Sequence, residues 1–169
     1  MQSRRLLVIR HARAGQGTGT DAERPLTDDG AQVAEAVVSW LADHDLRPDR
    51  ALVSSALRAV ETWAAIARGA GWELEPQESP PLYTAEPESA LDLVREVDAA
   101  VATLALVGHN PTVGSLVQLL DDGEGDPDAG TALATSGFPP GAVAVLRHDG
   151  DWADLAWGSA RLVAYRSGG

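Results

Sequence analysis

The sequence predicts an α/β protein: a three-layer α/β/α sandwich with a mainly parallel central sheet and antiparallel strands late in the chain. Short apolar runs alternate with longer segments whose apolar residues recur at helical spacing, which is typical of a parallel sheet covered by helices. Near the C-terminus, two apolar runs flank Asp149-Gly150, a dipeptide that favours a hairpin between antiparallel strands. We expect residues 1–169 to form a single domain, which is usual for this length.

Several short apolar segments have the character of buried strands. Residues 6–10 form a run of aliphatic side chains that ends in charge, so this strand should be buried and should deliver its last residues to an edge of the sheet. The Pro-rich connection at residues 71–86 has room for one further short strand. The strands that we expect are residues 6–10, 50–54, 103–107, 142–147 and 152–157.

The helices between these strands are marked by apolar spacing and by capping residues. Thr27 is a good N-cap, because Asp28 and Asp29 follow it in the first turn, where carboxylates interact favourably with the helix dipole. Before a later helix, Asn110 can act as the cap and Pro111 can occupy the first helical position. The helical segments that we expect start at residue 28, span residues 57–67 and 89–97, and start again at residue 111.

An acidic segment at residues 121–130 is predicted to be a mobile surface loop. It is rich in Gly and Asp and shows no hydrophobic periodicity. Its carboxylates invite a calcium-binding interpretation, but the spacing lacks the closing Glu of an EF-hand loop and Pro127 interrupts it. A solvated loop is therefore the favoured hypothesis, and its role stays open.

The charge of the chain argues against several classes of partner. Asp and Glu outnumber Lys and Arg by 25 to 13, and the net charge of −12 repels nucleic acid and anionic membrane surfaces. The sequence has no Cys, which excludes disulfides, thiol nucleophiles and thiolate metal sites. The apolar run at residues 6–9 is too short for a signal peptide or a membrane span. We therefore expect a cytoplasmic protein that binds neither nucleic acid nor membranes.

Side chains that suit phosphate chemistry fall at the carboxyl ends of the predicted strands. Arg10 and His11 end the first strand, Arg58 lies in the first turn of a helix, and His109 follows the strand at residues 103–107. Ligands of open α/β sheets bind at this edge, where helix N-termini also point partial positive charge. Guanidinium groups can hold phosphoryl oxygens while a neutral imidazole attacks phosphorus. The same cations disfavour protonation of the imidazole, so they keep it nucleophilic.

Four short motifs follow one another in an order that is specific when taken together. They are Arg10-His11-Ala12; Glu23-Arg24-Pro25-Leu26-Thr27 with Gly30; Ser54-Ser55-x-x-Arg58-Ala59-x-x-Thr62; and Gly108-His109-Asn110-Pro111. This set resembles the histidine phosphatase superfamily, also called phosphoglycerate-mutase-like, and within it the short SixA-type phosphohistidine phosphatases. The resemblance spans nearly the whole chain. Ala56 stands where the family often has Pro, and Glu61 where it often has Gln, and both leave the expected contacts intact.

The resemblance implies a two-step reaction in which His11 takes the phosphoryl group and water then releases it. Arg10 and Arg58 would clamp the phosphate oxygens, and His109 would donate a further hydrogen bond. Arg24 matches the family's Arg-Pro-Leu-Thr position near the pocket, where it would contact substrate or brace the loop. Neither a metal ion nor another cofactor is expected. The partner would be a phosphorylated protein carrying phosphohistidine, or a small phosphorylated molecule.

The sequence leaves open which residue, if any, acts as the general acid. Larger members of the superfamily supply a carboxylate from the middle of the chain, and here the segment at residues 82–88 offers Glu86 as the best candidate. SixA-type chains lack a dedicated carboxylate at this point. A leaving imidazole needs less help than an alkoxide, because its nitrogen can be protonated before the bond breaks. Absence of the acid would favour phosphohistidine, and its presence would favour small phosphomonoesters.

Simpler interpretations stand beside these. A histidine at a strand end is often only a hydrogen-bonded structural residue, and Arg24 could equally be an ion-pairing loop residue. A non-catalytic module could use the same Arg pair to dock a phosphorylated partner, although the intact His11 and His109 argue against it. His44 and His148 lie in polar, turn-like surroundings and are expected to be solvated.

Overall fold

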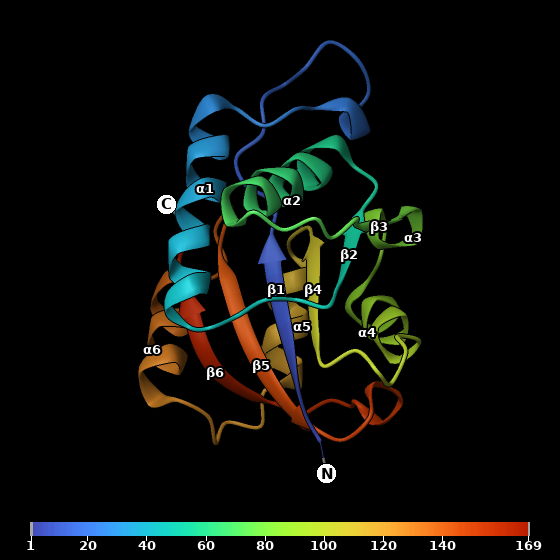
Figure 1. The fold of residues 1–169 in the computed structure, drawn as a ribbon, viewed down its shortest axis with the longest axis vertical. Helices are drawn as coiled ribbons and strands as arrows, with labels where there is room; N and C mark the ends of the chain where they lie inside the picture. The colour runs from blue at the N-terminus through green and yellow to red at the C-terminus, as the bar shows by residue number, and fades with distance from the viewer. Residues whose placement is uncertain (1, 169) are drawn as a thin grey trace.

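The protein is built on a six-stranded mixed sheet, described for residues 2–168 by a computed structural model (Figure 1). The strands are β1 (Ser3–Arg10), β2 (Arg50–Ser54), β3 (Gln77–Ser79), β4 (Thr103–Gly108), β5 (Val143–Asp149) and β6 (Arg161–Arg166). They lie in the order β3-β2-β4-β1-β5-β6. The pairs from β3 to β1 are parallel, whereas β5 runs antiparallel to both β1 and β6. The predicted mainly parallel sheet with late antiparallel strands is confirmed.

Helices cover both faces of this sheet and make the predicted three layers. They are α1 (Asp28–Asp43), α2 (Leu57–Ala70), α3 (Pro80–Tyr83), α4 (Pro87–Arg95), α5 (Thr112–Leu120) and α6 (Pro127–Ser136). The apolar residues of α1 and α2 share one buried cluster with one face of the sheet, and those of α3 to α6 share a second cluster with the other face. In residues 2–168, no helix is long and apolar enough to cross a membrane.

β1 shows why the first apolar run is a central strand. Leu7 and Ile9 pack toward α1 and α2, and Leu6 and Val8 pack toward the opposite helical layer. All four are at most 1% exposed. A strand covered on both faces is apolar at every position instead of alternating, which is the pattern in the sequence. This burial fixes β1 rigidly and with it the position of the residues that follow.

The carboxyl ends of β1, β2 and β4 meet at one edge of the sheet, and the segment between β1 and α1 arches over that edge (Figure 1). Thr27 caps α1 as predicted, because its side chain accepts a hydrogen bond from the N–H of Gly30 at 3.0 Å. The arch is anchored close to β1, since the N–H of Thr27 donates to the carbonyl of Arg13 at 2.9 Å. The fold therefore gathers three strand ends and one long connection around the same point.

The second strand of the late antiparallel pair is not where the sequence predicted it. β5 covers the first predicted segment, but residues 152–157 form no strand, and the partner of β5 is β6. The residues after Asp149-Gly150 instead include a 3-10 helix, Trp152–Asp154. The cause is burial: Trp152 is fully enclosed and its indole N–H donates to the carbonyl of Val101 at 2.8 Å. A side chain inserted into the core turns this segment inward.

The predicted loop over residues 121–130 is wrong for its second half. Pro127 opens α6, and the Asp126 carboxylate caps that helix by accepting from the N–H of Ala129 at 2.8 Å. The first half is tied to β6, because the N–H of Asp126 donates to the carbonyl of Leu162 at 2.8 Å and the N–H of Leu162 donates to Asp121 at 3.1 Å. These bonds tie the first half of the acidic segment to β6 although it has no apolar periodicity.

Three local details also differ from the sequence expectations. Pro111 precedes α5 as its N-cap residue instead of filling the first helical position. His148 lies in β5 and is only 5% exposed, so the expectation that it is solvated is wrong. The connection at residues 71–86 holds the expected short strand, β3, and also the short helix α3, which carries no apolar periodicity.

Candidate active site

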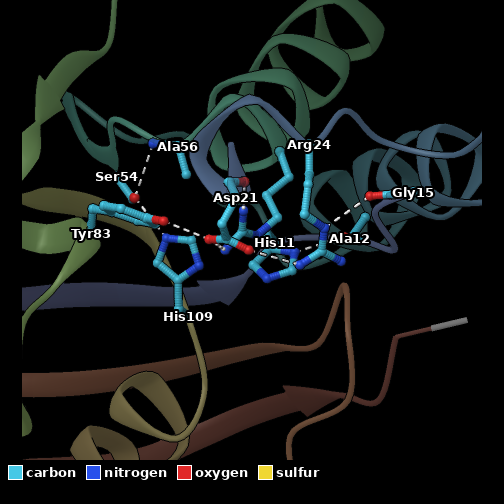
Figure 2. A network of polar contacts seen from close by, with 10 residues as sticks. His11, Ala12, Gly15, Asp21, Arg24, Ser54, Ala56, Tyr83 and His109 are labelled. Carbon is cyan, nitrogen blue, oxygen red and sulfur yellow. Dashed lines mark hydrogen bonds and ion pairs between the residues drawn. The ribbon is translucent and has the colours of Figure 1, made fainter. Parts of the chain in front are cut away.

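A cavity of about 460 Å³ opens where β1, β2 and β4 end. Arg10 pairs with Gly108 in the β1–β4 register, so His11 and His109 leave neighbouring strands side by side, with ring centroids 5.1 Å apart (Figure 2). The structure thus brings together all but one of the site residues predicted from the sequence. The lining residues are Arg10, His11, Asp21, Arg24, Arg58, Tyr83, Thr84, His109 and Asn110.

Hydrogen bonds fix the orientation and the tautomer of His11. Its Nδ1 faces the carbonyl oxygen of Ala12 at 2.7 Å, so Nδ1 carries the proton and donates it (Figure 2). Ala12 is held in turn, because its N–H donates to Oγ1 of the buried Thr62 at 3.0 Å. With the proton on Nδ1, Nε2 keeps a free electron pair. This is the arrangement that a nucleophilic imidazole requires.

The electrostatics of the site keep His11 uncharged. Burial lowers the pKa of His11 to about 4, and the positive charges of Arg58, Arg10 and Arg24 act in the same direction. The hydrogen bond to Ala12 opposes this shift without cancelling it. Protonation of a partly buried ring beside guanidinium groups is unfavourable, because both desolvation and like charge disfavour the cation. His11 is therefore neutral near pH 7.

The hydroxyl of Ser54, at the end of β2, contacts the ring of His109. Ser54 Oγ lies 2.6 Å from His109 Nε2 and accepts from the N–H of Ala56 at 3.3 Å. Burial, followed by His11 and Arg58, lowers the pKa of His109 to about 4, so this ring is also neutral. The Ser54 hydroxyl can donate to Nε2, and in that arrangement the proton of the neutral His109 lies on Nδ1. Nδ1 is thus free to donate to an anion.

Arg10 is anchored at the edge of the same cavity. Its Nη1 donates to the carbonyl of Phe138 at 3.0 Å, and the amide of Asn110 donates to that same carbonyl at 3.0 Å. The shared carbonyl joins the end of β1 to the start of α5. Anchoring at one nitrogen leaves other N–H groups of the Arg10 guanidinium for a ligand.

Asp21 organises the remaining two arginines. Its Oδ1 accepts from Arg24 Nη1 at 3.0 Å, and the hydroxyl of Tyr83 donates to its Oδ2 (Figure 2). Oδ2 also accepts from Arg58 Nη2 at 3.0 Å. Arg58 Nη1 donates in addition to the backbone carbonyl of Asp21 at 2.8 Å. Arg24 is held in addition by its Nε, which donates to the carbonyl of Gly15 at 2.9 Å. The remaining N–H groups of both guanidinium groups can bind phosphoryl oxygens.

Glu86 is the one predicted site residue that does not line the cavity. It is exposed at the N-cap position of α4, and its side chain makes no capping hydrogen bond. Thr84, which lines the cavity, lies two residues earlier in the chain. The proposed role of Glu86 as a proton donor therefore has no support from its position.

Sequence reasoning missed Asp21, Tyr83 and the function of Ser54. Ser54 occupies a strand end exactly as Arg10 does, and the rule that ligands bind at strand ends could have singled it out. Asp21 carries only a weak signal: it lies three residues before Arg24 in a polar connection, a spacing at which opposite charges can meet. Tyr83 lies on the unpredicted helix α3, and no local pattern connects it to Asp21.

The cavity offers cationic and imidazole groups in place of a metal-binding cluster. Within residues 2–168, no group of three or more His, Asp or Glu side chains is placed to hold a metal ion. The positive charge that a phosphate would meet comes instead from Arg10, Arg24 and Arg58. Catalysis without a metal stays a prediction.

Comparisons with known proteins identify the family. The model of the histidine phosphatase superfamily (branch 1) matches residues 6–83. The structure of a putative phosphohistidine phosphatase SixA from Nakamurella multipartitia superimposes with a TM-score of 0.83 and 33% identity, covering 98% of this chain and 96% of that one. The chain therefore belongs to the histidine phosphatase superfamily.

Within this superfamily, the similarity is to the SixA-type branch, as the motifs predicted. A putative SixA from Agrobacterium tumefaciens has a TM-score of 0.79 and 30% identity, with 96% of this chain and 97% of that chain covered. Phosphohistidine phosphatase SixA of Escherichia coli strain K12 is 26% identical over 133 residues, which are 78% of this chain and 83% of that protein.

Proposed function

We propose that this protein is a metal-independent phosphatase that hydrolyses protein phosphohistidine through a covalent phosphoryl intermediate on His11. Nε2 of His11 attacks phosphorus while Arg10, Arg58 and Arg24 bind the phosphoryl oxygens. His109 donates from Nδ1 to the oxygens that gain charge in the transition state. Water then attacks the phosphorylated His11 and restores the neutral ring.

The observation that carries this proposal is the state of His11. A neutral ring whose proton is bound by Ala12 presents Nε2 to a cavity lined by three arginines. A site that only docked phosphate would gain from a protonated, cationic histidine, because the cation would add to the attraction. Burial and the neighbouring guanidinium groups favour the opposite state. Nucleophilic catalysis is what this state supports.

The leaving group favours a phosphorus–nitrogen bond over a phosphorus–oxygen bond. An alkoxide must receive a proton as it leaves, and Glu86, the predicted donor, lies outside the cavity lining. A phosphorylated imidazole can leave as a neutral ring if its other nitrogen is already protonated. The names of the SixA relatives agree with this substrate class. The partner is then a phosphorylated protein whose phosphohistidine reaches the open cavity.

A side-by-side rate comparison tests this proposal. The substrates are free phosphohistidine, a phosphorylated histidine phosphotransfer domain, para-nitrophenyl phosphate, and a panel of sugar and nucleotide phosphates, each with and without a chelator. We expect the phosphohistidine substrates to have the highest kcat/KM among biological substrates, with no loss after chelation. Faster hydrolysis of sugar phosphates would make small phosphomonoesters the substrates. Binding without turnover would make the protein a docking module, and a loss of rate restored by magnesium would refute the metal-free site.

A further inference from the structure

The carboxylate of Asp21 lies at the mouth of the cavity with unused hydrogen-bonding capacity. Its side chain is 51% exposed, although it contacts Arg24, Arg58 and Tyr83. A carboxylate has about four acceptor sites, divided between its two oxygens. Oδ2 is used by Arg58 and Tyr83, whereas Oδ1 is used by Arg24 alone. Oδ1 can therefore accept one more N–H group from a ligand at the mouth.

Asp21 acts as an acceptor and not as a proton donor. Hydrogen bonds from Tyr83, Arg24 and Arg58 hold the pKa of Asp21 well below its usual range, so the carboxylate stays ionised. Its own negative charge favours protonation of His109, but burial and cationic neighbours outweigh it there. An ionised carboxylate cannot protonate an alkoxide leaving group. It can stabilise a leaving group that already carries a proton.

The transfer step is chemically symmetrical when the substrate is phosphohistidine, because phosphorus moves between two imidazole nitrogens. On the enzyme side, the far nitrogen of His11, Nδ1, donates to the carbonyl of Ala12. On the substrate side, the far nitrogen of the leaving imidazole needs an equivalent acceptor. Of the residues described as lining the cavity, Asp21 is the one that carries a carboxylate.

We propose that Asp21 determines specificity for phosphohistidine by accepting, on Oδ1, a hydrogen bond from the protonated far nitrogen of the leaving imidazole. This inference rests on the proposed function. The bond from His11 Nε2 to phosphorus forms as the substrate P–N bond breaks, and the electron pair of that bond stays on the leaving nitrogen. The far nitrogen keeps its proton, so the product is neutral imidazole and the phosphorylated His11 carries the positive charge. No other proton donor is needed.

The experiment compares two substrates that use the same arginines but differ in the leaving group. The leaving group of free phosphohistidine is an imidazole ring that can be protonated. The leaving group of para-nitrophenyl phosphate is a stabilised phenolate with no N–H group. The variant is Asp21→Asn, which keeps the shape of the side chain but removes the negative charge that would make the hydrogen bond from the leaving imidazole strong. The matched control is Glu23→Gln, which removes one negative charge from the same turn. Gln keeps the side-chain oxygen that accepts from Thr20. Thermal unfolding checks that both variants are folded.

We expect Asp21→Asn to lower the ratio of kcat/KM for phosphohistidine to that for para-nitrophenyl phosphate at least tenfold, and Glu23→Gln to leave this ratio within twofold. If Asp21 only positioned Arg58 and Arg24, both substrates would lose rate by the same factor and the ratio would not change, which would overturn the proposal. Wild-type enzyme that hydrolyses para-nitrophenyl phosphate but not phosphohistidine would instead refute the proposed function.

The pH dependence of kcat of the wild-type enzyme is a second test of the contact between Asp21 and the leaving imidazole, and it needs no variant. The basic limb of kcat reports the pKa of the bound substrate. A carboxylate beside the leaving imidazole favours its protonated form, so this limb should lie about one pH unit or more above the pKa of free phosphohistidine. The groups that face Asp21 are Arg24, Arg58, Tyr83 and His109; the hydrogen bond to Asp21 raises the pKa of Tyr83, and burial keeps the pKa of His109 at about 4, so neither ring titrates near neutral pH. A limb at the pKa of the free substrate would refute the contact.

Discussion

Ser54→Ala removes a single buried hydroxyl and should damage catalysis through His109. Ser54 is fully buried, and its Oγ is bonded both to His109 Nε2 at 2.6 Å and to the N–H of Ala56 at 3.3 Å. Without the hydroxyl, Nε2 of His109 has no donor facing it and can take the proton itself. Nδ1 then becomes an acceptor and repels the phosphoryl oxygens to which it would donate.

The magnitude follows from the bonds that are lost. A hydrogen bond to a charged group contributes about 1.5 to 3 kcal/mol, so loss of the His109 donor should lower kcat/KM about 10- to 100-fold. Leaving the N–H of Ala56 and Nε2 of His109 without a partner in a buried region should lower the free energy of unfolding by about 1 to 3 kcal/mol. Both effects are far larger than those expected for an ordinary surface substitution.

The assay is steady-state hydrolysis of para-nitrophenyl phosphate together with urea unfolding. Ser55→Ala is the matched control, because Ser55 is the next residue and no side-chain hydrogen bond is described for it. We expect the control to keep kcat/KM within about twofold of wild type. A Ser54→Ala enzyme with wild-type kcat/KM would refute the role of Ser54 in setting the tautomer of His109.

Three further predictions concern charge, packing and protonation. Arg58→Ala should lower kcat about 100-fold or more, because it removes a donor to the charge of the transition state; a change confined to KM would contradict this role. In urea unfolding, Gly30→Ala should destabilise the fold by about 2 kcal/mol, because its Cβ would lie 2.2 Å from the carbonyl oxygen of Arg13. Gly130→Ala, on α6 and facing open space, should instead stabilise the fold by about 0.5 to 1 kcal/mol. His11 should titrate near pH 4 by NMR, and a midpoint near 6.5 would contradict its burial. Because this pKa is below the value of about 6.5 in the unfolded chain, the stability linked to the neutral ring is complete above pH 6.5 and is lost as the pH falls toward 4.

The core of the site could be predicted because strand ends are local features. Arg10, His11 and His109 directly end or follow apolar runs, and parallel strands bring such ends to one edge of the sheet. Arg58 follows β2 by a few residues and shares this logic. These positions depend on the order of the elements and not on fine packing, so a sequence pattern is sufficient.

The rest of the site depends on contacts between distant segments. Asp21 meets Arg58 across 37 positions and Tyr83 across 62, and neither separation leaves a periodic signal. Burial also explains why the strand predicted at residues 152–157 does not form: Trp152 inserts into the core, so this segment turns inward instead of extending. The acidic segment escaped prediction because hydrogen bonds to β6 hold it, without apolar spacing.

The covalent intermediate on His11 can be measured directly. The enzyme is mixed rapidly with phosphohistidine or para-nitrophenyl phosphate, quenched in alkali, where phosphohistidine survives, and analysed by intact mass and peptide mapping. We predict a transient gain of one phosphoryl group, located on the peptide that contains His11 and absent from His11→Asn, which should also lack turnover. Steady turnover by His11→Asn at more than a few per cent of the wild-type rate, or a phosphoryl group found on another residue, would contradict the assignment of His11 as the nucleophile.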